Sequence, residues 1–172
     1  VQQLPVRFML DRAGFVGADG PTHHGIYDLT YLRMIPKMTI MVPCNGAEFR
    51  CMIEFAYNHE TGPLAIRYPR GNTAELDENQ IQPIEFGKSQ ILRKGQNVAL
   101  FAVGTMVEKA EQVADLLEKQ GVCASVINAR FVKPMDEDLI INLGRDSKLL
   151  VSLEENTIHG GFGSGILEIL SK

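Results

Sequence analysis

Residues 11–25 read DRAGFVGADGPTHHG, a stretch that contains two acids, one arginine, two histidines and four glycines. Segments of this composition lie on surface loops, where binding and catalytic residues concentrate. The residues just before it, VRFMLD at 6–11, are mostly apolar and end in an acid, which predicts a buried parallel strand that leads into the loop. Because ligands of open α/β sheets bind outside the carboxyl ends of the strands, we expect a ligand-binding loop here.

A second predicted strand, residues 64–67, leads into another polar loop, YPRGN at 68–72. Arg12 and Arg70 thus follow two different strands and can converge at one edge of a sheet. Guanidinium groups bind phosphate through paired, charge-assisted hydrogen bonds, so this placement suits an anion. From the residues alone, a surface ion pair remains the alternative for each arginine. Arg67 is expected to point into the fold or toward a neighbouring subunit.

The loop also carries two adjacent histidines, His23 and His24. An imidazole that titrates near ~6.5 can donate a hydrogen bond or transfer a proton at neutral pH. His23 is therefore a candidate catalytic or substrate-binding residue, with a solvated loop histidine as the alternative. Adjacent side chains point in different directions, and Asp11 and Asp19 do not complete a ligand set, so we expect no metal site.

The rest of the chain predicts alternating strands and helices, which is the pattern of an α/β fold. In the first half we expect helices at 28–34 and 46–57, the second capped by Asn45, and strands at 38–42 and 64–67. After a polar, acidic stretch at 73–86, the expected strands are 98–103, 123–128 and 148–153, and the expected helices are 106–120, one opening at 134, and 165–172. The strand–helix–strand unit from 98 to 128 should be parallel.

Three short motifs in the second half are interpreted as structural. Gly104-Thr105 reads as a tight turn and helix cap, with an anion site at the helix start as the alternative. The sequence EEN at 154–156 follows a strand and is expected to have a positional role. The glycines of HGGFGSG at 159–165 do not fit a dinucleotide-binding pattern, so this segment is expected to let the last helix pack closely.

Composition excludes several classes of protein. The chain has 172 residues, 45% of them hydrophobic, which is enough for one large or two small domains with a core. A net charge of −4 with dispersed basic residues argues against a nucleic-acid surface. The apolar runs are far shorter than the roughly 20 residues of a membrane span, and no signal segment opens the chain, so we expect a cytoplasmic location. Three cysteines without CxxC spacing predict free thiols.

The two ends of the chain have an unusual sequence. Val1 leads into a predicted strand almost at once, without an initiator methionine. Residues 165–172 form an amphipathic helix that stops without a glycine cap or a following strand. We therefore expect the chain to be a piece of a longer protein.

Three motifs carry a resemblance to a known family: GADGPTH at 17–23, YLRMIP at 31–36 and RYPRGN at 67–72. Together they resemble the transketolase-like, thiamine-diphosphate-dependent enzymes and, among these, the 1-deoxy-D-xylulose-5-phosphate synthase family. The resemblance covers essentially the whole chain. It implies two partial three-layer α/β domains with mainly parallel sheets. Residues 1–75 would be the C-terminal part of a pyrimidine-binding domain, 76–90 a linker, and 91–172 a truncated transketolase C-terminal domain.

The resemblance also implies roles for individual residues. His23 would contact the substrate near the reacting carbon and act in catalysis. Arg12 and Arg70 would bind the phosphate of glyceraldehyde 3-phosphate, and Asp19 would lie beside the same substrate.

For the full-length parent, the resemblance implies a cytoplasmic homodimer. This enzyme would decarboxylate pyruvate on thiamine diphosphate and join the product to glyceraldehyde 3-phosphate, in the biosynthesis of isoprenoid, thiamine and pyridoxal precursors. In the family, the magnesium-diphosphate motif and the glutamate that activates the cofactor lie in sequence that would precede Val1. We therefore expect these 172 residues alone to be inactive.

Other functions are compatible with the same fold. Transketolase itself and the β subunit of a 2-oxoacid dehydrogenase share it, and RYPRGN is the motif that favours the synthase. A non-catalytic α/β binding module is the alternative from a different class.

Overall fold

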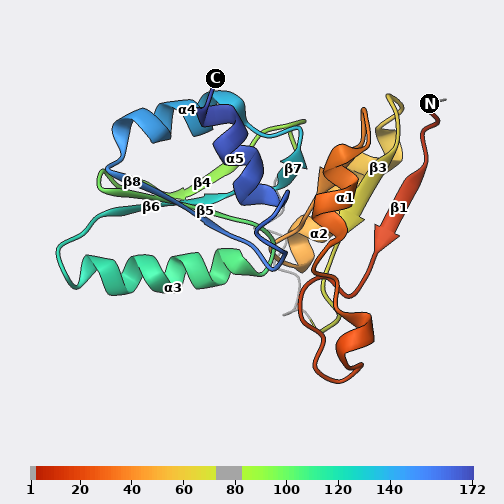
Figure 1. Cartoon of the computed structure of the whole chain (residues 1–172), viewed down its shortest axis with the longest axis horizontal. Helices are drawn as coiled ribbons and strands as arrows, with labels where there is room; N and C mark the ends of the chain where they lie inside the picture. Colours follow the sequence, from red (N-terminus) through yellow and green to blue (C-terminus); the bar gives the residue numbers. More distant parts are fainter. Residues whose placement is uncertain (1–2, 73–82) are drawn as a thin grey trace.

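The strands of the computed structural model, which describes residues 3–72 and 83–172, form two four-stranded sheets (Figure 1). In the first sheet, two strands run parallel to the strand between them, and the fourth is antiparallel to its neighbour. The order in this sheet is β1 (Arg7–Leu10), β3 (Leu64–Arg67), β2 (Thr39–Met41) and β7 (Phe131–Lys133). Because β1 and β3 are parallel, the loops that follow them leave the sheet on the same side, at the carboxyl ends of the strands.

Helices cover both faces of the first sheet. Helix α1 (Asp28–Met34) packs on the face that presents Ile40, and α2 (Gly46–Asn58) packs on the face that presents Met41. Because neighbouring residues of a strand point to opposite faces, the two helices lie on opposite sides of the sheet. Asn45 caps α2 as predicted, since its Oδ1 accepts a hydrogen bond of 2.8 Å from the amide of the third helical residue.

The second sheet follows the same plan. Its order is β4 (Gln90–Arg93), β6 (Ala124–Asn128), β5 (Val98–Ala102) and β8 (Leu149–Leu153), with β6, β5 and β8 parallel and β4 antiparallel. Helix α3 (Met106–Glu118) covers one face, and α4 (Glu137–Asp146) and α5 (Phe162–Leu170) cover the other (Figure 1). The prediction of two three-layer α/β units with mainly parallel sheets is confirmed.

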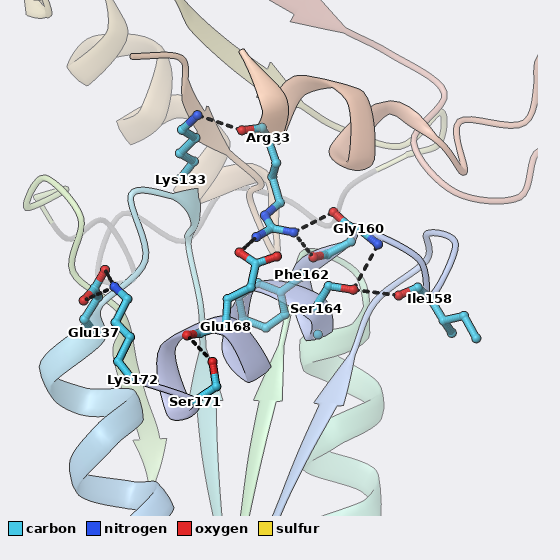
Figure 2. Close-up of polar contacts among 12 residues, drawn as sticks. Arg33, Lys133, Glu137, Ile158, Gly160, Phe162, Ser164, Glu168, Ser171 and Lys172 are labelled. Carbon is cyan, nitrogen blue, oxygen red and sulfur yellow. Dashed lines mark hydrogen bonds and ion pairs between the residues drawn. The ribbon is translucent and has the colours of Figure 1, made fainter. Parts of the chain in front are cut away.

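The two units are joined by one apolar core and by polar contacts. Buried side chains of α1 and of the α4/α5 face of the second sheet belong to a single cluster. Arg33 of α1 donates hydrogen bonds of 2.6 and 2.7 Å to the carbonyls of Gly160 and Gly161 and pairs with Glu168 at 2.7 Å (Figure 2). Lys133 of β7 donates to the carbonyl of Arg33 at 2.7 Å (Figure 2). The first sheet thus takes both a strand and helix contacts from the second half of the chain.

Several sequence predictions differ from the structure. The strand at 6–11 was predicted as buried, but Phe8 is 42% exposed, because β1 pairs with β3 alone at the end of the sheet order. Strands β4 and β7 were not predicted. Helix α5 begins at Phe162, three residues earlier than expected, so the glycine-rich segment runs into the helix.

The expected linker lies partly outside the described residues. Residues 76–82 of the expected linker at 76–90 lie outside the described residues, and the division of the chain into domains stays a prediction. Of the helices in the described ranges, none has the length and apolar character to cross a bilayer.

The buried carboxylate of Glu48 links α2 to the segment between β6 and β7. It accepts hydrogen bonds from Arg130 Nε at 2.7 Å, from Asn128 Nδ2 at 2.8 Å and from the amide of Cys44 at 2.8 Å. Glu48 is 5% exposed and Asn128 is fully buried. Burial and the nearby Glu48 carboxylate also raise the pKa of the Cys44 thiol, so this cysteine is uncharged. In this network the buried charges of Glu48 and Arg130 compensate each other.

Replacement of Glu48 by alanine should strongly destabilise the fold. Glu48→Ala leaves the Arg130 guanidinium buried without its carboxylate, and we expect a loss of about 3–5 kcal/mol in the free energy of unfolding. The measurement is urea denaturation followed by circular dichroism. The control is Glu54→Ala, an exposed carboxylate on the same helix, which should change stability by no more than about 0.5 kcal/mol. Equal losses in the two variants would contradict this assignment.

Candidate functional site

The two predicted loop arginines meet on one carboxylate at the carboxyl edge of the first sheet. Arg12, from the loop after β1, donates from Nε to Asp19 Oδ2 at 2.8 Å. Arg70, from the loop after β3, donates from Nη1 to the other carboxylate oxygen of Asp19, and Arg12 also pairs with Asp11. The predicted convergence of Arg12 and Arg70 is confirmed, because β1 and β3 are parallel neighbours.

The electrostatics of this cluster favour its charged form. The hydrogen bond from Arg70, followed by that from Arg12, lowers the pKa of the Asp19 carboxyl. The Asp19 bond in turn raises the pKa of Arg12. The side chains of Arg12 and Arg70 are 36% and 50% exposed, so both face solvent. Arg12 pairs with both Asp11 and Asp19 and Arg70 with Asp19, but a guanidinium has five N–H donors, so these ion pairs leave donors on each arginine for an anion.

Backbone strain accompanies this cluster. Arg12 has a φ of +61°, a left-handed conformation that is unfavourable for a residue with a long side chain. Such strain persists only where the surroundings hold the residue in place, and it is concentrated at functional sites. Here the two ion pairs of Arg12 and the amide of Ala13, which donates to the carbonyl of Tyr68 at 3.0 Å, fix this part of the chain.

The base of the loop is closed by two glycines and one buried arginine. The backbones of Gly14 and Gly25 exchange hydrogen bonds of 2.9 and 3.0 Å. Arg67 is 3% exposed and points into the fold; its Nε pairs with Asp28 at 2.8 Å. Its Nη2 donates to the carbonyls of Gly25 at 2.5 Å and of Glu155 at 2.8 Å. Arg67 thus connects the loop to both halves of the chain.

The two histidines of the loop have different environments. His23 is exposed in the short helical turn η1 (Pro21–His23), and its Nδ1 lies 3.0 Å from the Thr22 hydroxyl. His24 is a structural support, because its Nδ1 accepts a hydrogen bond of 2.9 Å from the amide of Val16 and its ring meets the edge of Phe15. Within residues 3–72 and 83–172, no hydrogen bond joins His23 to the arginine cluster.

One contact of an expected helix cap was missed. Thr105 is the N-cap residue of α3, as expected, but its side chain makes no capping hydrogen bond. Its Oγ1 instead donates to Glu155 Oε2 at 2.5 Å. The neighbouring Glu154 accepts hydrogen bonds from the amides of Phe162 and Gly163, at the start of α5. The strand-end position of EEN indicated a positional role, but only the tertiary structure shows what each residue contacts.

A separate cavity of about 720 Å³ lies between α2 and residues 83–86. It is lined mainly by apolar and aromatic side chains, including Phe55, His59 and Phe86, and by none of the predicted site residues. Burial lowers the pKa of His59. In the part of the chain that the structure describes, no group of His, Cys, Asp and Glu side chains has an arrangement that could hold a metal ion.

Two family models match the chain in tandem. The model "Transketolase, pyrimidine binding domain" matches residues 1–75, and "Transketolase, C-terminal domain" matches residues 87–172. The fold and these matches define a pair of transketolase-type α/β domains. The chain belongs to the transketolase family.

Within this family the chain is similar to 1-deoxy-D-xylulose-5-phosphate synthases. The synthase of Crocosphaera subtropica is 51% identical over 172 residues, which are 99% of this chain and 27% of that protein. The synthase of Thermosynechococcus vestitus is 49% identical over 174 residues, with 100% of this chain and 27% of that protein covered. These relatives confirm the resemblance seen in the three motifs. The chain spans 27% of the length of these two relatives.

A solved structure supports the same fold. The protein described as "Split gene transketolase, inactive beta4 tetramer" superposes with a TM-score of 0.86 at 33% sequence identity. The superposition covers 96% of this chain and 53% of that chain. The expected transketolase-like architecture is therefore confirmed.

The Asp19 carboxyl should titrate below the ordinary aspartate value of about 3.9, because its two arginine partners favour the ionised form. Since the pKa of Asp19 is lower in the folded state, its ion pairs stabilise the fold above about pH 4. This contribution is lost as the pH falls through the pKa of Asp19 in the folded state. The measurement is a carbon-13 NMR titration of this carboxyl. Arg70→Ala should raise the midpoint more than Arg12→Ala.

The control for this titration is Arg50→Ala, which removes an exposed arginine of α2 and should leave the midpoint unchanged. A midpoint that stays the same in Arg70→Ala would contradict the geometry of the cluster.

Proposed function

We propose that the chain is part of a 1-deoxy-D-xylulose-5-phosphate synthase, which decarboxylates pyruvate with thiamine diphosphate and condenses the two-carbon product with glyceraldehyde 3-phosphate. The observation that carries the proposal is the convergence of Arg12 and Arg70 at the carboxyl edge of the first sheet, in a chain whose relatives are named as this synthase. The product would supply isoprenoid, thiamine and pyridoxal biosynthesis. The full-length enzyme would be a cytoplasmic homodimer.

In this proposal the two arginines bind the phosphate of the acceptor substrate. Asp19 holds the guanidinium groups side by side, so that their remaining N–H donors can form charge-assisted hydrogen bonds with the phosphate oxygens. This arrangement reduces the ordering cost of binding, because the arginines are already placed. With its phosphate held by the two arginines, the substrate presents its aldehyde end at a defined distance from them.

His23 is proposed to act at the reacting end of the substrate. Its Nδ1 lies 3.0 Å from the Thr22 hydroxyl, and the residue is exposed, so Nε2 can contact a substrate. A neutral or protonated imidazole at this place can donate a hydrogen bond to an oxygen on the reacting carbon and can transfer a proton near neutral pH.

Thiamine diphosphate, when bound, supplies the nucleophilic carbon of the reaction. The described residues of this chain do not fit the magnesium ion that would hold the diphosphate, since they include no suitable ligand group. The family resemblance assigns the magnesium motif and the activating glutamate to sequence that would precede Val1.

The 172-residue chain alone should have no synthase activity and should bind thiamine diphosphate weakly or not at all, because the family resemblance places those groups in other sequence and the described residues include no metal-ligand group. The measurement is isothermal titration calorimetry with thiamine diphosphate in the presence of Mg²⁺, with EDTA as the matched control. Micromolar binding that disappears with EDTA would show that the chain carries a cofactor site of its own.

In the full-length protein, Arg70→Ala and Arg12→Ala should each lower kcat/KM for glyceraldehyde 3-phosphate by roughly ten- to a hundredfold, since a hydrogen bond to a charged group is worth about 1.5–3 kcal/mol. Decarboxylation of pyruvate should be largely preserved. His23→Ala should instead depress kcat with both substrates saturating, because a group beside the reacting carbon acts on the transition state.

An unphosphorylated aldehyde serves as the comparison acceptor, and Arg50→Ala serves as the control for loss of a surface arginine. If Arg70→Ala impairs the unphosphorylated acceptor as severely as glyceraldehyde 3-phosphate, then Arg70 is not a phosphate ligand.

A further inference from the structure

The carboxylate of Glu155, from the second unit, lies directly against the base of the loop that carries Asp19 and His23. A Cβ atom built on Gly14 would lie 2.7 Å from Glu155 Cδ, which is closer than real Cβ contacts. Gly14 also has a φ of +76°, a conformation that favours glycine. The Glu155 side chain therefore occupies the space that any larger residue at position 14 would need.

Two other contacts fix the segment around Glu155 to the same part of the loop. The carbonyl of Glu155 accepts a hydrogen bond of 2.8 Å from Arg67, which also binds the carbonyl of Gly25. The amide of Thr157 donates to the carbonyl of Ile26 at 2.8 Å. The residues after β8 thus pack against the paired backbones of Gly14 and Gly25.

The orientation of the Glu155 side chain is set by Thr105. A glutamate side chain loses rotamer freedom when it is fixed, so it needs a partner that holds it against the loop. Thr105 supplies this partner, because its hydroxyl donates to Glu155 Oε2 at 2.5 Å and does not cap α3. Contacts therefore connect the start of α3 to Glu155, and Glu155 to Gly14.

The loop itself has few buried groups of its own. Between the two glycines, Phe15, Gly17, Ala18 and residues 21–23 are exposed, and Val16 is the buried hydrophobic residue. A segment with little buried apolar surface depends on its polar contacts for order, and here these are the ion pairs of Asp19, the hydrogen bond from Val16 to His24 and the contacts at the two ends. The contacts of Glu155 below Gly14 and Gly25 are therefore one of the constraints on where Asp19 and His23 lie.

We propose that Glu155 and Thr105 are positioning residues through which the second unit holds the 14–25 loop in its binding geometry. The effect on substrate use rests on the proposed function, whereas the structural effect on the loop does not. Neither residue touches the substrate in this proposal.

Amide hydrogen exchange of this 172-residue chain tests the structural part. Thr105→Val and Glu155→Ala should speed exchange of the Gly14 and Gly25 amides by about tenfold, as expected for the loss of one hydrogen bond to a charged group. The double variant should exchange no faster than Glu155→Ala alone, because both changes remove the same contact. Thr105→Ser, which keeps the hydroxyl, should restore the wild-type rate.

The matched control is Glu168→Ala, which removes another carboxylate that bridges the two units but contacts Arg33 away from the loop (Figure 2). It should leave the Gly14 and Gly25 amides unchanged. Unchanged exchange in Thr105→Val and Glu155→Ala would overturn the proposal. So would faster exchange across both sheets, because that pattern indicates general destabilisation.

Kinetics of the full-length protein test the functional part. Thr105→Val and Glu155→Ala should raise KM for glyceraldehyde 3-phosphate and lower kcat, each several-fold, because the loop carries both Asp19 and His23, with recovery in Thr105→Ser. If the loop amides lose protection while KM and kcat are both unchanged, these residues do not position the substrate site. If Arg70→Ala also leaves kcat/KM for glyceraldehyde 3-phosphate unchanged, the proposed function is wrong. The structural role of Glu155 is then still decided by the amide hydrogen exchange of Gly14 and Gly25.

Discussion

The buried guanidinium of Arg67 is the interaction on which the arrangement of the site depends. It lies at the end of β3, pairs with Asp28 at the start of α1, and donates to the carbonyls of Gly25 and Glu155. A buried charge without its partners is costly, so these segments are stable only when they are assembled together. One side chain thereby fixes a strand, a helix, the loop and the second unit relative to one another.

Around Arg67, the arginines of the two loops remain close to solvent. Arg12 and Arg70 are partly exposed and share Asp19, which keeps two positive charges close together. Like charges at this separation repel each other, and the carboxylate offsets that repulsion. The cluster therefore combines the buried guanidinium of Arg67 with two arginines that are accessible to solvent.

The second unit contributes directly to the base of this site. Its sheet and helices share an apolar cluster with α1, and its Glu155 packs against Gly14. Arg33 adds hydrogen bonds to the segment that begins α5. Since these contacts involve residues far apart in sequence, the geometry of the loop is a property of both units and not of the first sheet alone.

By itself, the sequence determined the alternation of strands and helices and the Asn45 cap, because periodicity and capping are local rules. The sequence left open whether Arg12 and Arg70 converge, because that requires β1 and β3, which are far apart in the chain, to be parallel neighbours in one sheet. Only the tertiary structure decided the three-residue strand β7, the exposure of β1 and the bond from Thr105 to Glu155. A short strand has no periodicity to detect, and the burial of a strand depends on its neighbours in the sheet. The partner of a hydroxyl is likewise settled by which distant groups the fold brings within hydrogen-bonding distance.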